Sequence, residues 1–110
     1  MFDEINSFEE FSVLKENEPA LLAYFSTDVC NVCKVLTPKV EELIQTKFPK
    51  IKLVYVRSDK LPEVAAQNQV FAAPTILIFF DGREYIRKSR NIGIGELKQE
   101  IERPYSMMFS

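Results

Sequence analysis

The chain has 110 residues, 46% of them hydrophobic, which is typical of one globular domain with a buried core. Its net charge of −2 argues against a protein that binds a nucleic-acid backbone, because such a protein needs a basic surface. The absence of histidine excludes catalysis by imidazole and removes the commonest nitrogen ligand of zinc.

The first half of the sequence predicts three strands and two helices. Residues 2–5 predict a short strand, and a Ser-x-x-Glu capping box opens a helix over about 7–15. The continuous apolar run at 20–25 is typical of a strand that is buried on both faces. Apolar residues that recur at helical spacing predict a long helix over 31–47, and a further strand is expected at 51–56.

The second half begins with a short helix, predicted over 61–69, and a dense apolar strand at 75–80. Asp81-Gly82 favours a tight hairpin turn, so residues 84–89 are expected to pair antiparallel with that strand. The polar side chains of this last strand are typical of the edge of a sheet.

A final helix is predicted over 95–102 and is expected to end at Pro104, because proline lacks the N–H that a helix needs. The residues that follow complete an apolar tail over 104–110. We expect this tail to fold back onto the domain or to fray, with a contact to a partner or a second copy as the alternative.

This order of elements predicts an α/β fold in a single domain over residues 1–110. Buried strands separated by helices imply a parallel pair joined by a right-handed crossover, and the hairpin adds antiparallel strands. We therefore expect a central mixed sheet of four to five strands with helices on both faces. The chain has no long apolar run and begins with acidic residues, so we predict no membrane span, no secretory signal and a cytoplasmic location.

The only two cysteines of the chain form the motif Cys30-Asn31-Val32-Cys33 at the predicted start of the long helix. Two thiols at this spacing can close a disulfide between neighbouring helical turns and open it again, so the motif favours exchange of a disulfide with another molecule. Three alternatives stay open: a permanent structural disulfide, a metal site shared between two copies, and a pair of inert buried thiols.

With the order of elements, four local features make the chain resemble the thioredoxin family over residues 6–103. They are Cys30-Asn31-Val32-Cys33-Lys34, Pro38 five residues after Cys33, Ala73-Pro74-Thr75 before a buried strand, and the Asp81-Gly82 turn. The resemblance implies the thioredoxin fold. It also implies that Pro74 follows a cis peptide bond and packs against the disulfide.

The sequence also departs from the family pattern and looks like a divergent, bacterial-type thioredoxin-like protein. Family members usually carry tryptophan before the first cysteine and Gly-Pro between the two, whereas Val29 and Asn31-Val32 stand at these places. Alignment puts Tyr24 and Tyr55 where the family usually has a buried aspartate and a lysine. We expect both tyrosines to be core packing residues, with a catalytic role as the alternative.

The position of each cysteine predicts its role in exchange. The unpaired N–H groups and the dipole of a helix N-terminus favour a thiolate, so Cys30 is the expected nucleophile and Cys33 the resolving thiol. Asp28 would oppose the Cys30 thiolate if it points inward, and Lys34 would support it. Tyr24 cannot serve as a carboxylate base near neutral pH, so we expect slow resolution or a proton route through water or Asp28.

The leading hypothesis is a protein-disulfide reductase with no bound cofactor and no metal. The resemblance implies disulfide-containing protein substrates, and electrons from an NADPH-dependent flavoprotein of the thioredoxin reductase type. We expect a monomer without nucleic-acid or membrane partners. The alternative is a redox-sensing or adaptor module with little reductase turnover. The expected docking surface around Cys30 is apolar and consists of Val29, Val32, Ala72, Ala73 and Ile92.

Overall fold

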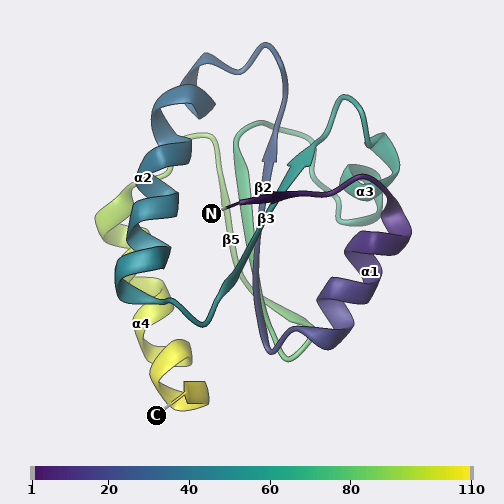
Figure 1. The fold of residues 1–110 in the computed structure, drawn as a ribbon. Helices are drawn as coiled ribbons and strands as arrows, with labels where there is room; N and C mark the ends of the chain where they lie inside the picture. Colours follow the sequence, from purple (N-terminus) through teal and green to yellow (C-terminus); the bar gives the residue numbers. More distant parts are fainter. Residues whose placement is uncertain (1, 110) are drawn as a thin grey trace.

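The computed structural model describes residues 2–109; Met1 and Ser110, the two ends of the predicted 1–110 domain, lie outside the described residues. Within residues 2–109 the chain forms five strands and four helices, arranged around one sheet (Figure 1). In chain order the elements are β1 (Asp3–Glu4), α1 (Phe8–Asn17), β2 (Ala20–Ser26), α2 (Asn31–Lys47), β3 (Lys52–Arg57), α3 (Pro62–Gln67), β4 (Thr75–Phe80), β5 (Arg83–Ser89) and α4 (Ile94–Phe109).

The sheet has the strand order β1-β3-β2-β4-β5 and is mixed, as predicted. β3 is parallel to both β1 and β2, because helices carry the chain back between them. β4 is antiparallel to β2, and β5 is antiparallel to β4. Asp81 and Gly82 make the turn between the last two strands with positive φ angles of 57° and 78°, which is the conformation that short hairpins favour.

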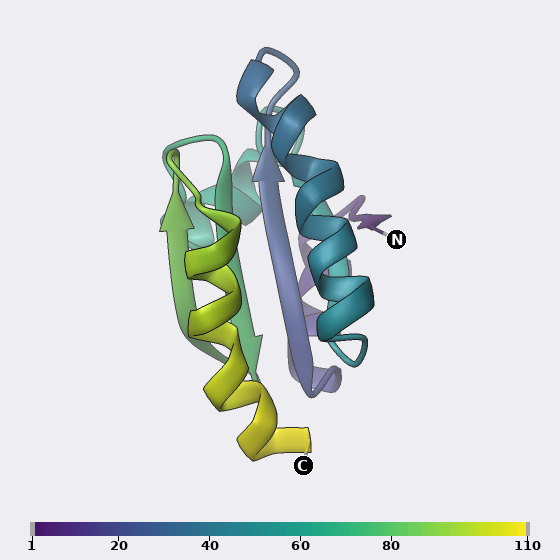
Figure 2. The same cartoon turned by 90° about the vertical axis from the view of Figure 1, so that its left-hand side faces the viewer.

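Helices cover both faces of the sheet, which confirms the predicted layers. α1 and α3 lie on one face, while α2 and α4 run side by side across the other (Figures 1 and 2). All of β2 is buried, and its side chains alternate between two hydrophobic clusters. Leu22 and Tyr24 belong to the cluster under α2 and α4, and Leu21 and Phe25 to the cluster under α1 and α3.

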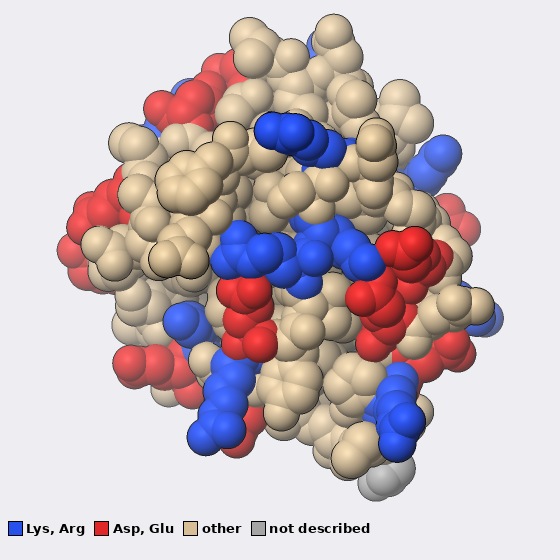
Figure 3. Space-filling view, turned by 180° about the vertical axis from the view of Figure 1, so that it is seen from behind, with Lys and Arg blue, Asp and Glu red and all other residues tan. Residues whose placement is uncertain are grey.

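The opposite character of β5 also follows the prediction for an edge strand. Ile86 is its only buried residue, and it packs into the cluster under α2 and α4. Lys and Arg side chains cross the face of the molecule on the β5 side, with Asp and Glu side chains next to them (Figure 3). These charges protect the strand from pairing with another chain.

The prediction that Pro104 ends the last helix is wrong, because α4 continues through it to Phe109. A proline inside a helix removes one backbone hydrogen bond and crowds the preceding turn. Packing of the tail offsets this cost: the ring of Tyr105 meets Phe48 edge-on with centroids 5.0 Å apart, and the Tyr105 hydroxyl accepts a hydrogen bond from the Lys50 N–H at 3.2 Å. The tail therefore packs back on the protein, as a continuation of the helix.

The topology brings three connections to the same end of the sheet (Figures 1 and 2). They are the loop from β2 into α2, the loop from α3 into β4, and the loop from β5 into α4. The first contains Cys30 and the second contains Ala73-Pro74. The predicted functional residues therefore gather at this end although they come from distant parts of the sequence.

Candidate active site

Cys30 and Cys33 are joined by a disulfide at the N-terminus of α2, with their Cα atoms 5.4 Å apart. Cys30 is the N-cap residue of the helix, and its sulfur accepts a hydrogen bond from the Cys33 N–H at 3.2 Å. The Cys30 side chain is half-buried, whereas Cys33 is only 3% exposed. The structure thus shows the oxidised pair with one accessible and one buried sulfur.

The loop before β4 lies at the same end of the sheet as this pair (Figures 1 and 2). The Ala73–Pro74 peptide bond is cis, which confirms the expectation, while the packing of Pro74 on the disulfide stays a prediction. The buried Thr75 hydroxyl donates to the Ala72 carbonyl at 2.8 Å, and the Arg90 N–H donates to the Pro74 carbonyl at 2.7 Å. Hydrogen bonds from the first residue of β4 and from the residue after β5 therefore hold this loop in place.

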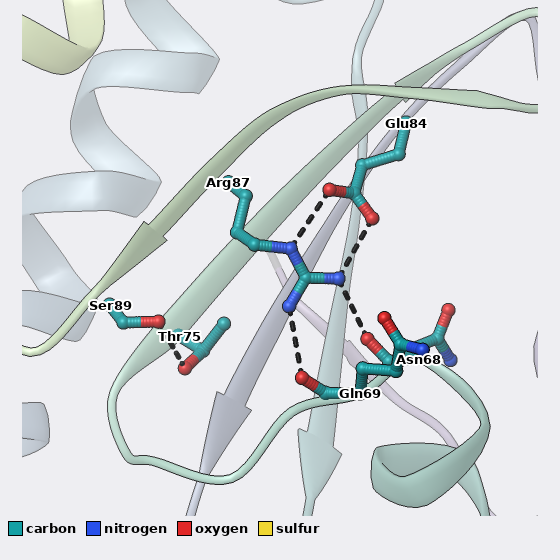
Figure 4. Close-up of polar contacts among 6 residues, drawn as sticks. All are labelled: Asn68, Gln69, Thr75, Glu84, Arg87 and Ser89. Carbon is teal, nitrogen blue, oxygen red and sulfur yellow. Dashed lines mark hydrogen bonds and ion pairs between the residues drawn. The ribbon is translucent and has the colours of Figure 1, made fainter.

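A second set of bonds holds the beginning of the same loop from β5 (Figure 4). The Arg87 guanidinium donates to the carbonyl oxygens of Asn68 and Gln69, at 2.7 Å and 3.1 Å, and forms two bonds of 2.9 Å with the Glu84 carboxylate. The hydroxyls of Thr75 and Ser89 are hydrogen-bonded at 3.1 Å in the same region. The long stretch between α3 and β4 is thus attached to the sheet edge at both ends.

Tyr24 is fully buried behind the disulfide. Its hydroxyl lies 3.5 Å from the Cys33 carbonyl oxygen, to which the Thr37 hydroxyl donates a shorter bond of 2.6 Å. The Tyr24 ring stacks on Tyr55 at 5.6 Å and meets Phe2 edge-on. Burial raises the pKa of Tyr24; hydrogen bonding with Thr37 opposes this shift, and Tyr55 adds to it. The phenol is therefore neutral throughout the physiological range.

Asp28, two residues before Cys30, does not carry an isolated charge. Its carboxylate forms an ion pair with the guanidinium of Arg57 at the end of β3, and its N–H donates to Asp59 at 3.4 Å. The ion pair stands at a small pocket of about 220 Å³ that reaches both cysteines. The other residues that line this pocket are Ser26, Thr27, Lys34, Thr37 and Tyr55.

Comparison with known proteins shows the family to which this chain belongs. A sequence model described as Thioredoxin matches residues 3–103. The chain belongs to the thioredoxin family. It is 34% identical over 84 residues to the "Thioredoxin-like protein YdfQ" of Bacillus subtilis (strain 168), a match that covers 76% of this chain and 74% of that protein.

Two further comparisons extend over most of this thioredoxin-family protein. The chain is 30% identical over 96 residues to a thioredoxin of Rickettsia bellii (strain RML369-C), with 87% of each protein covered. The X-ray structure of Fasciola hepatica thioredoxin superposes with a TM-score of 0.81 at 28% identity, covering 94% of this chain and 98% of that one. The thioredoxin fold is therefore shown, and family membership together with a close cysteine pair supports dithiol–disulfide oxidoreductase activity in general.

The residues expected to form the docking surface of this thioredoxin-family protein divide between two hollows. Val32 and Ile92 line a groove of about 690 Å³ beside α2, while Ala72 and Ala73 line a pocket of about 360 Å³ beside α3. Val29 is 87% exposed next to Cys30 and lines neither of them.

Sequence reasoning missed two residues that the structure brings to this end of the sheet. Phe71 is 84% exposed and lines the pocket with Ala72 and Ala73, and Arg57 neutralises Asp28. The position of this phenylalanine directly before the Ala-Ala-Pro segment could have been found in the sequence, whereas its exposure could not. The partnership of Arg57 with Asp28 could not, because it depends on how β3 meets the loop after β2.

Among residues 2–109, His, Cys, Asp and Glu side chains do not gather into a group that could hold a metal ion. The same part of the chain contains no helix that is both long and apolar enough to cross a membrane.

Proposed function

We propose that this protein is a thiol–disulfide oxidoreductase that reduces protein disulfides through Cys30 and Cys33. The observation that carries the proposal is the closed Cys30–Cys33 disulfide at the start of α2, with one accessible and one buried sulfur. In the reduced protein, the helix dipole and the free N–H groups of the first turn stabilise the Cys30 thiolate, the form that attacks disulfides. The bond from the Cys33 N–H to the Cys30 sulfur is one such contact.

The reaction proceeds in two exchanges. The Cys30 thiolate attacks one sulfur of the substrate disulfide, so that a Cys30–substrate disulfide forms and the other substrate sulfur leaves as a thiolate. The Cys33 thiolate then attacks the Cys30 sulfur, closing the Cys30–Cys33 disulfide and releasing the second substrate thiolate. Two electrons pass from the protein to the substrate, and the structure corresponds to the oxidised product.

The substrate would dock on the apolar surface that surrounds Cys30, with an extended segment along the backbone of Ala73. A two-electron donor must then reopen the disulfide. We propose an NADPH-dependent flavoprotein of the thioredoxin reductase type as this donor, with the protein acting as a monomer in the cytoplasm and carrying no cofactor of its own. A reducing compartment suits this role because it keeps the dithiol form available.

A second function is favoured by one observation, the neutral Tyr24 at the place where the family usually has a buried aspartate. Without a buried carboxylate at this place, resolution of the mixed disulfide is slower, and a long-lived mixed disulfide is what a redox sensor or adaptor module requires. The competing proposal is therefore a binding module that holds a partner through Cys30 with little turnover.

Turnover of insulin reduction, with dithiothreitol as the electron donor, tests the proposed function. Cys30→Ser should abolish turnover. In a separate reaction from which dithiothreitol has been removed, the reduced Cys33→Ser variant should instead accumulate a mixed disulfide with the substrate, which non-reducing electrophoresis and mass spectrometry detect. Circular dichroism under reducing conditions, where neither the wild type nor a variant contains the disulfide, checks that each protein is folded. A Cys33→Ser variant that traps no substrate would contradict the assigned roles.

The reduction potential of the Cys30–Cys33 pair separates the two candidate functions. It is measured by equilibration against glutathione or dithiothreitol buffers. A strongly reducing potential with steady turnover supports the reductase. An oxidising potential, or a stoichiometric complex without turnover, supports the sensor or adaptor module.

A further inference from the structure

Arg90 adopts an unusual backbone conformation beside the proposed active site. Among residues 2–109, three non-glycine residues have a positive φ: Gln69 at 56°, Asp81 at 57° and Arg90 at 65°. Asp81 lies in the hairpin turn, where aspartate is common, and the carbonyl of Gln69 is bound by Arg87. Arg90 has the bulk that disfavours this region, and its N–H is bonded to the Pro74 carbonyl.

Arg90 also differs from its neighbours in ion pairing. Arg87 is paired with Glu84, and Lys88 forms ion pairs with Glu96 and Glu100. In the described part of the chain, Arg90 is exposed and has no such partner. Figure 3 shows a band of Lys and Arg side chains with Asp and Glu side chains beside it on the β5 side.

At the end of the sheet that carries the disulfide, the exposed charges favour an anionic partner although the whole chain has a net charge of −2. Asp28 is neutralised by Arg57. Lys34 and Arg90 then remain as exposed cations without an ion-pair partner among residues 2–109, opposed by Asp59, whose carboxylate accepts the N–H of Asp28. A partner that carries acidic groups would therefore be complementary in charge to this end of the sheet.

We propose that Arg90 is a specificity residue that favours substrates with acidic side chains close to the cysteine under attack. The inference rests on the proposed function, because it concerns the segment that docks along Ala73-Pro74. The hydrogen bond between Arg90 and Pro74 fixes the Arg90 backbone at the edge of that segment. Glycine would adopt this left-handed conformation without strain. The backbone strain of Arg90 is therefore the cost of having a cation at this position.

The test measures a single exchange, so it does not require reductase turnover. The Cys33→Ser variant is reacted with peptides whose only cysteine is joined by a disulfide to 2-nitro-5-thiobenzoate. The Cys30 thiolate attacks the peptide sulfur, the Cys30–peptide disulfide forms, and the coloured thiobenzoate thiolate leaves. Two peptides of equal length, one with aspartates and one with lysines around the cysteine, give a ratio of second-order rate constants.

Arg90→Gln, made in the Cys33→Ser background, should lower this acidic-to-basic ratio about threefold at low ionic strength, with a smaller effect as salt is added. Arg83→Gln is the matched control, since Arg83 is an exposed cation at the far end of β5 and likewise lacks an ion-pair partner among residues 2–109. It should leave the ratio unchanged.

Arg90→Gly separates the charge from the backbone. Glycine relieves the left-handed strain, so the melting temperature should rise while the ratio falls as in Arg90→Gln. A melting temperature that rises without any change in the ratio would show a purely structural residue and overturn the inference. An equal loss of selectivity in Arg83→Gln would overturn it too, by making the preference an effect of overall charge. Failure of the wild type in insulin reduction would contradict the reductase, while the exchange ratio would still decide the role of Arg90.

Discussion

The carboxylate of Asp28 is ion-paired with the guanidinium of Arg57, and this contact joins the loop before Cys30 to the end of β3. Without this ion pair, the negative charge of Asp28 would be uncompensated two residues from the proposed nucleophile. A nearby anion disfavours a thiolate, so the ion pair removes an electrostatic obstacle to exchange. It also limits the freedom of the loop that carries Val29 and Cys30.

Arg57→Gln should therefore raise the pKa of the Cys30 thiol in the reduced protein, because Asp28 keeps its charge and loses its partner. The rate of alkylation by iodoacetamide near neutral pH should fall accordingly. Both partners are partly exposed, so the effect will be modest and will weaken as the salt concentration increases. Ultraviolet absorbance of the thiolate during a pH titration measures the shift directly.

The double variant Asp28→Asn, Arg57→Gln is the control for this prediction. It removes both charges, and the pKa of Cys30 should return towards that of the wild type. If the double variant shifts as far as Arg57→Gln alone, the change comes from altered loop structure and the electrostatic account is wrong.

Tyr24 supplies a prediction about pH and stability. Its pKa is raised in the folded protein, so its contribution to stability is complete below the unfolded value of about 10 and is lost as the pH rises above that value. Tyr24→Phe should therefore lose less stability than the wild type between neutral pH and strongly alkaline pH. Urea unfolding across this range measures the difference.

At neutral pH, Tyr24→Phe should cost no more than about 1 kcal/mol, since the hydroxyl makes a long bond to a carbonyl that Thr37 already satisfies. Resolution of the mixed disulfide by Cys33 should keep its wild-type rate. A marked slowing in stopped-flow measurements would reveal a catalytic hydroxyl and would count against a packing role. Tyr85→Phe, which alters an exposed tyrosine on β5, is the matched control.

The sequence was most informative where a local pattern decides the structure. The apolar run of β2 identified a strand buried on both faces, and Asp81-Gly82 identified the hairpin, because side-chain burial and turn geometry depend on near neighbours. α4 shows the limit of such reasoning. Pro104 disfavours a helix locally, but Tyr105 gains contacts with Phe48, which is far away in the sequence, and the tertiary packing prevails.

Some features of the candidate site could likewise be predicted from the sequence, and others could not. The two cysteines, their place at the helix start and the cis bond before Pro74 could be expected from a short motif and a family resemblance. The partners of charged residues could not. Arg57 and Arg90 acquire their significance from strand ends that meet only in the folded protein, and composition alone gives a net charge without showing which charges are paired.

Arg87 should act as a clamp on the loop between α3 and β4. Arg87→Gln removes charge-assisted bonds to the Asn68 and Gln69 carbonyls and to Glu84, with an expected cost of about 1–2 kcal/mol. Hydrogen exchange of the amides in residues 68–74 should accelerate more than exchange in β2. Arg83→Gln removes an equal charge from the same strand and should change neither the stability nor the local exchange.

The same clamp predicts a dependence on acid. Hydrogen bonding with Arg87 holds the pKa of Glu84 below its ordinary value, so this stability is present above about pH 4.3 and is lost as the pH falls through the folded pKa. The stability advantage of the wild type over Arg87→Gln should therefore shrink in acid. An advantage that stays constant down to strongly acidic pH would show that the Glu84 contact contributes nothing.

Tyr105 should anchor the helical tail beyond Pro104. Its ring packs on Phe48 and contacts Phe109, and its hydroxyl accepts the Lys50 N–H. Tyr105→Ala removes a half-buried aromatic ring and should lower the free energy of unfolding by about 2 kcal/mol, roughly half the cost in a full core. Tyr105→Phe removes only the hydroxyl and should cost about 0.5–1 kcal/mol.

Urea unfolding measures both variants, with Met107→Ala as the control. Met107 lies in the same part of α4 but is exposed, so its truncation should change the stability by less than about 0.5 kcal/mol. Helix content should fall in Tyr105→Ala because Pro104 disfavours the last turns once their packing is lost. If Tyr105→Ala and Met107→Ala are equally mild, the tail is held by the helix alone, and the explanation given for its passage through Pro104 is wrong.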